Sequence, residues 1–150
     1  MGELEKSRQF FEQALDMHVA SGEVYPFVLT LLNLALSYIV EEKFDTAEDY
    51  LEESLSFIDD KYPLLYAKVR FHYGLIAAGK KQFETARQEH HIALGITKDL
   101  DDKILKKQIE VELGKLDKLE DEFFKEQSSH KDMWLVTPIG SDADSSKAVK

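Results

Sequence analysis

Cysteine is absent from this 150-residue chain, which excludes a disulfide scaffold and any metal site built from thiolates. A cysteine-free chain fits a reducing compartment, and we expect a cytoplasmic protein. Long apolar runs are also missing, because the longest, residues 27–32, is far too short to cross a bilayer. The N-terminal stretch MGELEKSRQF carries as many acidic as basic side chains and lacks the apolar run of a secretory signal.

The motifs of common catalytic and cofactor sites are missing as well. The sequence contains no HExxH, no CxxC and no glycine-rich phosphate loop. The adjacent His90 and His91 would point about 100° apart on a helix, so they cannot share one metal ion. The many carboxylates fit helix caps and solvated helix faces. The sequence therefore predicts a protein that is not an enzyme and that binds no cofactor or metal.

The charge balance is strongly acidic, with a formal net charge of −10. Such a surface repels phosphate backbones and anionic lipids, so we expect no direct contact with nucleic acid and no membrane binding. A basic peptide would be attracted to it. The alternative is that the acidic charge keeps an extended helical surface soluble.

A two-helix pattern at residues 31–55 recurs at residues 70–94. In each unit, apolar residues at helical spacing flank a short turn. Four positions of the first unit, Ala35, Phe44, Ala47 and Ser54, are matched at one constant offset by Gly74, Phe83, Ala86 and Ala93. We call the interval from Ala35 to Gly74 the repeat offset. Two helices this short cannot bury their apolar faces alone, so repetition indicates stacked pairs.

Half units flank these two complete units. One lies upstream, at Leu4, Ser7, Phe11 and Ala14, which precede Phe44, Ala47, Leu51 and Ser54 by one constant interval. The other lies downstream, where Leu113 and Gly114 match Tyr73 and Gly74 at that same interval, one position longer than the repeat offset. The pattern therefore extends over most of the chain.

This pattern resembles the tetratricopeptide repeat family, over roughly residues 2–124. Its period of about 40 residues is longer than the family's usual value of about 34 residues and is similar to that of the sensor domains of peptide-pheromone regulators. The resemblance implies an all-α fold, a right-handed superhelical array of antiparallel helix pairs. Gly22 should end the first helix in the left-handed conformation, and Asp45 with Glu48 predicts a capping box.

The chain is predicted to consist of a repeat domain at 1–127 and a tail at 128–150. Within the repeat domain we expect a half repeat at 1–21, two repeats at 22–60 and 61–99, and a capping helix at 100–127.

The resemblance also implies a function, because repeats of this family bind an extended peptide or partner segment in a concave groove. Asn33, the only asparagine, offers a donor and an acceptor to a peptide backbone. The apolar residues beside it have an alternative reading, as core covered by a missing upstream helix. The residues expected to line the groove are Leu29, Leu32, Asn33, Leu36 and Ile39, then Lys68, Phe71, His72 and Leu75, and finally Lys115.

The tail contains an apolar segment at 133–139 that includes the only tryptophan. Pro138 and its β-branched neighbours favour an extended conformation there. The segment supports a second hypothesis, a self-assembly domain or homodimer whose groove or open end is filled by its own tail. A third is a fragment of a peptide-pheromone-sensing regulator. The residues expected to self-associate are Leu116, Leu119, Phe123, Trp134, Leu135 and Val136.

Overall fold

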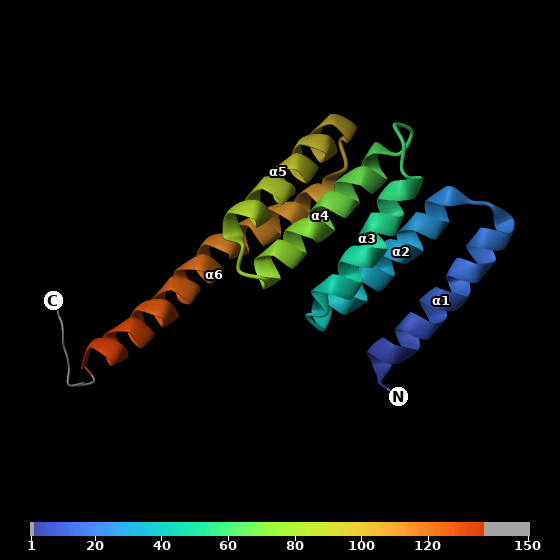
Figure 1. Cartoon of the computed structure of the whole chain (residues 1–150). Coiled ribbons are helices and arrows are strands. Elements are labelled where there is room, and N and C mark those ends of the chain that lie inside the picture. Colours follow the sequence, from blue (N-terminus) through green and yellow to red (C-terminus); the bar gives the residue numbers. More distant parts are fainter. Residues whose placement is uncertain (1, 137–150) are drawn as a thin grey trace. The chain divides into compact units, whose positions relative to one another are not determined.

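The computed structural model describes the backbone of residues 2–136 and the side chains of residues 2–129. Over this part of the chain the structure consists of six helices and contains no strand, which confirms the all-α prediction. The helices are α1 (Glu3–Ser21), α2 (Val24–Val40), α3 (Phe44–Phe57), α4 (Pro63–Gly79), α5 (Phe83–Leu100) and α6 (Lys103–Val136) (Figure 1).

Two hairpins of antiparallel helices, α2 with α3 and α4 with α5, form the centre of the first compact unit (Figure 1). The turn between α2 and α3 and the turn between α4 and α5 have the same backbone conformation and hydrogen bond. Glu42 and Lys81, which are separated by the repeat offset, both have a positive φ, of 62° and 65°. The next amide along donates to a carbonyl five residues back in each turn, Lys43 to Tyr38 at 2.9 Å and Gln82 to Ala77 at 2.8 Å. The repeat that the side-chain pattern indicates is therefore also present in the backbone hydrogen bonds of the two turns.

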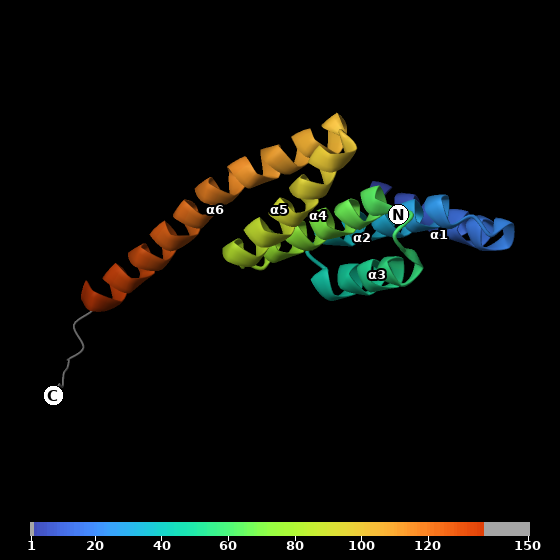
Figure 2. The ribbon, with the colours of Figure 1, turned by 90° about the horizontal axis from the view of Figure 1, so that it is seen from above.

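The hairpins pack on each other through α2 and α3 against α4, and α1 packs on α2 (Figure 2). One core cluster gathers buried residues of α2, α3 and α4, including Leu31, Leu51 and Leu65. A second joins α4 and α5 to the start of α6 through Ala67, Ala93, Leu105 and Ile109. The apolar interior is thus divided among neighbouring helices.

The chain forms two compact units, residues 1–116 and 117–150, and α6 contributes to both. In the first unit Leu116 is only 1% exposed. The prediction that the last helix ends at about Gln127 is wrong, because α6 continues to Val136. The extended conformation predicted for 133–139 is therefore also wrong up to Val136, and its remaining residues lie outside the described part. Pro138 restricts chiefly the residue before it, so it permits a helix as far as Val136.

The helix ends follow local chemistry. Gly22 ends α1 with a φ of 74°, as predicted, and its amide donates to the His18 carbonyl. The capping box is wrong: α3 begins at Phe44 after Lys43 and has no side-chain cap, so Asp45 lies in the first turn, where its charge favours the helix dipole. Asp102 caps α6 by accepting from the Leu105 amide at 2.9 Å.

Candidate functional site

The predicted groove begins on α2, where the five expected residues differ in exposure. Asn33 is exposed and Leu36 is 39% exposed. Leu29 and Ile39 are half-buried against the first core cluster, and Leu32 is 3% exposed. Leu32 is therefore a core residue in this structure, and helices of this chain cover it without the upstream helix that the alternative reading assumed. What remains accessible is one amide flanked by partly exposed apolar side chains.

On α4 the expected groove residues are all half-buried. Phe71 packs in the second core cluster, with its ring 5.9 Å from that of His72 and 5.3 Å from that of His90. His72 Nδ1 donates to the Lys68 carbonyl at 2.6 Å, which leaves Nε2 as an acceptor. Burial lowers the pKa of His72 to about 4, so the ring is neutral near pH 7.

Part of the predicted set stands on two helices, α2 and α4, that pack against each other. Asn33 and Leu36 precede His72 and Leu75 by the repeat offset, and the two pairs stand on helices that pack against each other. Lys115 is exposed on α6 and forms an ion pair with Glu112 at 3.0 Å.

The residues expected to self-associate are not equally available. Leu116 is buried inside the first unit, Leu119 is 39% exposed and Phe123 is half-buried. Trp134, Leu135 and Val136 belong to α6, but their side chains lie outside the described residues.

Arg8 is a buried cation that the sequence reasoning missed. Its side chain on α1 donates from Nε to Ser37 Oγ and from Nη2 to the Ser37 carbonyl, both at 3.1 Å. Nη2 also bonds to Glu41, and the guanidinium lies 3.8 Å from the centre of the Tyr38 ring. Ser37 is in the last turn of α2, so Arg8 caps that helix and opposes the negative end of its dipole.

A signal for Arg8 was present in the sequence. Leu4, Arg8, Phe11 and Leu15 follow one another at spacings of four, three and four residues, so Arg8 occupies a position on the apolar face of α1. A cation on such a face needs an acceptor from another helix. The sequence did not say which acceptor.

His90 is a second buried polar residue, completely inaccessible to solvent, and neither ring nitrogen has a hydrogen-bond partner. It follows Leu51, an equally buried core residue, by the repeat offset. Gly74 faces the imidazole so closely that an added Cβ would lie 2.4 Å from His90 Cε1. The ring therefore fills a core position and makes no hydrogen bond there. Burial lowers its pKa to about 4, while the charge of Glu112 acts in the opposite direction.

Acid is expected to destabilise the fold through His90. The unfolded histidine takes up its proton near pH 6.5 and the folded one only near pH 4, so below pH 6.5 the unfolded chain binds more protons. The stability due to neutral His90 is present above pH 6.5 and is lost as the pH falls toward 4. The loss approaches about 1.4 kcal/mol per pH unit, and is on the order of 3 kcal/mol in all. Urea unfolding across this range measures the total pH dependence, to which His72, whose pKa is also lowered to about 4, contributes in the same direction. His90→Leu should remove only the part of the slope that is due to His90. An equal slope in that variant would assign the effect to other groups.

The described residues contain no group of three or more histidines or carboxylates placed to hold a metal ion. In the same part of the chain, no helix combines the length and the apolarity needed to cross a bilayer. The chain as a whole matches no protein-family model, no curated protein and no solved structure.

Proposed function

We propose that this chain is a non-catalytic protein-interaction module of the tetratricopeptide type, a right-handed array of helix pairs that binds an extended peptide across α2 and α4. The recurrence of both turns and their hydrogen bonds at the repeat offset supports the repeat architecture. Close recurrence of a hairpin favours stacking with a constant rotation between pairs, which produces a concave face.

The observation that carries the function is the environment of Asn33. This amide is exposed and makes no hydrogen bond within the described residues. It stands on a helix with no charged residue from Val24 to Val40, next to Leu36, which is 39% exposed. A primary amide can donate to a backbone carbonyl and accept from a backbone N–H, which suits an extended peptide. The neighbouring apolar side chains would hold the residues between those bonds.

His72 extends the same chemistry to the next pair. Its Nδ1 is engaged by the Lys68 carbonyl, so the neutral ring offers Nε2 as an acceptor. This position is the equivalent of Asn33 in the second hairpin. A peptide lying across α2 and α4 would therefore meet a polar group on each helix, separated by apolar contacts. Such alternation fits an extended segment whose own side chains alternate in direction.

The test is selection of binders from a random peptide display library with the full chain, followed by measurement of their dissociation constants. Asn33→Asp together with Leu36→Lys should weaken the selected peptides by about tenfold or more, because the variant loses a donor and places a charge among apolar groups.

A matched control is available on α5, where Gln88→Glu with Ile92→Lys makes the same change of charge at exposed positions. This control should change the dissociation constants by less than about twofold. Equal binding by the Asn33/Leu36 variant, or an equal loss in the control, would contradict the proposed site.

A further inference from the structure

A separate apolar cleft of about 250 Å³ lies where the end of α1, the start of α2 and the end of α3 meet. This volume is smaller than the roughly 300–1,000 Å³ of typical small-molecule sites, so it fits a side chain from another polypeptide better than a cofactor. The residues that line the cleft are His18, Val19, Gly22, Glu23, Val24, Phe27 and Phe57.

Two phenylalanines give the cleft its shape. Phe27 is 8% exposed and meets Phe57 edge to face, with ring centres 4.9 Å apart. Phe57 is 44% exposed although it stands at the end of a helix with a well-buried inner face. Val19, at the edge of the cleft, is 66% exposed. A partly exposed aromatic ring held against a buried one is a usual environment for an anchoring side chain at a protein interface.

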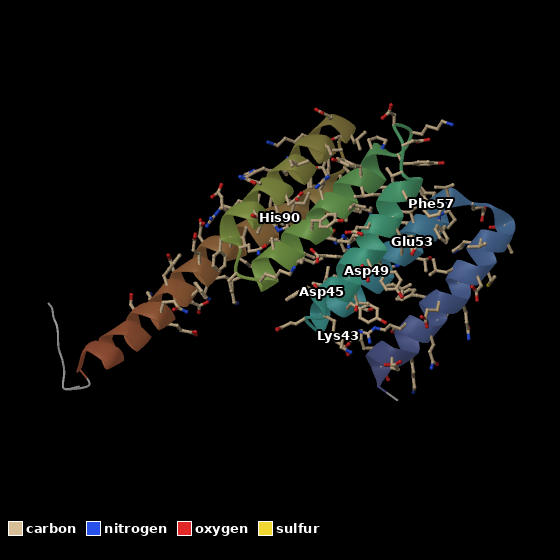
Figure 3. All side chains as sticks on the ribbon, in the orientation of Figure 1. Lys43, Asp45, Asp49, Glu53, Phe57 and His90 are labelled. Atoms are coloured by element: carbon tan, nitrogen blue, oxygen red, sulfur yellow. The ribbon has the colours of Figure 1, made fainter. Side chains whose placement is uncertain are left out.

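A row of carboxylates leads along α3 to this cleft. Asp45, Asp49, Glu53 and Phe57 follow one another at four-residue intervals, and Figure 3 shows them in this order along the helix. Within the described residues, the three carboxylates make no hydrogen bond or ion pair, unlike that of Glu48, which pairs with Lys80 at 3.4 Å. No basic residue occurs between Phe44 and Phe57.

Only Asp45, in the first turn, has a charge that favours the dipole of α3, and the other two carboxylates of the row do not stabilise this helix. Acids four residues apart repel each other on a helix, and Glu53 near the C-terminal end also opposes the helix dipole. The unpaired carboxylates are therefore better explained by binding to a partner, and their negative charge requires that the partner be positively charged. The apolar cleft supplies the binding pocket, and the carboxylates select a cationic ligand.

We propose that the cleft and the adjoining side of α3 bind a basic amphipathic helix of another protein. One apolar side chain of that helix would enter the cleft between Phe27 and Phe57. Its lysines or arginines, spaced four residues apart, would face Asp45, Asp49 and Glu53, because four residues advance both helices by about 6 Å. The net charge of −10 would accelerate the encounter. This surface is distinct from Asn33 and Leu36, so it does not depend on the function proposed above.

The probe is a synthetic amphipathic peptide with lysines at three positions four residues apart and one tryptophan a turn beyond them. A counterpart carries glutamate in place of each lysine. Fluorescence anisotropy with the full chain should give a dissociation constant on the order of 10 µM for the lysine peptide, weakening with added salt, and no binding of the glutamate peptide.

Matched variants separate a site from general attraction between opposite charges. Asp49→Lys with Glu53→Lys should weaken binding by about tenfold or more, whereas Glu122→Lys with Glu126→Lys on α6, which has the same spacing and change of charge, should weaken it less than about threefold. Val19→Lys should weaken binding more than Val40→Lys, and these valines are 66% and 68% exposed. All of these positions are exposed, and circular dichroism checks that each variant folds.

Three results would overturn the proposal: no binding of the lysine peptide, equal losses in the α3 and α6 variants, or a loss caused by Asn33→Asp with Leu36→Lys. The last would place the basic peptide on the face of α2 and α4 instead. Failure of either surface would leave the other unaffected, because their variants share no residue.

Discussion

Gly74→Ala is expected to destabilise the protein, although alanine is normally the better helix former. The new Cβ would lie 2.4 Å from His90 Cε1 and 2.5 Å from Nδ1, and the imidazole is fully buried. Overpacking of this kind costs about 1–3 kcal/mol, more than the gain in helix propensity of about 1 kcal/mol. Urea denaturation should show a net loss of up to about 2 kcal/mol.

His90→Leu is expected to act in the opposite direction. It removes two buried nitrogens without partners, whose desolvation costs about 1–3 kcal/mol, and keeps an apolar side chain in the core. The first hairpin already has this combination of leucine and alanine in its core. Leu51 and Ala35, both fully buried, occupy the positions equivalent to His90 and Gly74. The double variant, Gly74→Ala with His90→Leu, should therefore be at least as stable as the natural chain.

Gly95 provides a control for the variants at positions 74 and 90, because a Cβ added at Gly95 would meet nothing within 4 Å. Gly95→Ala should stabilise by up to about 1 kcal/mol through helix propensity alone. A destabilising Gly95→Ala, or a Gly74→Ala variant that His90→Leu does not rescue, would show that contact with the imidazole is not what requires glycine at position 74.

Arg8→Ala is expected to be the most destabilising substitution of a charged residue on α1. It removes the bonds to Ser37 and Glu41 and the contact with Tyr38, which itself stacks on Tyr50 at 5.7 Å. The side chain is only 7% exposed. Breaking a buried ionic network costs about 3–5 kcal/mol, and the value here should be near the lower limit because Glu41, with a side chain 34% exposed, can regain water.

Arg8→Lys should recover only a minor part of this loss. An ammonium group cannot reproduce the planar fork that bonds Ser37 and Glu41 while stacking on a tyrosine ring. Lys43→Ala is the control, since Lys43 contacts the same carboxylate at 3.4 Å but is 59% exposed. That change should stay within about 0.5 kcal/mol.

A titration of Glu41 tests the same network independently of stability. The hydrogen bond from Arg8 holds the pKa of Glu41 below its usual value, with a smaller contribution from Lys43. Arg8→Ala should therefore raise this pKa, as measured by carboxyl NMR, and Lys43→Ala should raise it less. An unchanged Glu41 titration in Arg8→Ala would contradict the network.

The sequence alone determined the helices and the repeat. Apolar spacing, the constant offset between matched positions and Gly22 are local signals, and helices and tight turns depend mainly on residues within one or two turns of each other. Two predictions about helix ends, the capping box at Asp45 and the end of the last helix at Gln127, were wrong. Neither a cap nor the last residue of a helix is determined by residue type alone.

Only the tertiary structure decided which side chains of an apolar face are covered. Leu32 and Leu36 belong to the same predicted stripe, yet one is 3% and the other 39% exposed. Arg8 finds its partners 29 and 33 residues away, and His90 finds none. The cleft between Phe27 and Phe57 exists only where three helix ends meet. Periodicity specifies the direction in which a side chain points, but burial and pairing depend on the neighbouring helix, whose distance and rotation are set by packing of the whole unit.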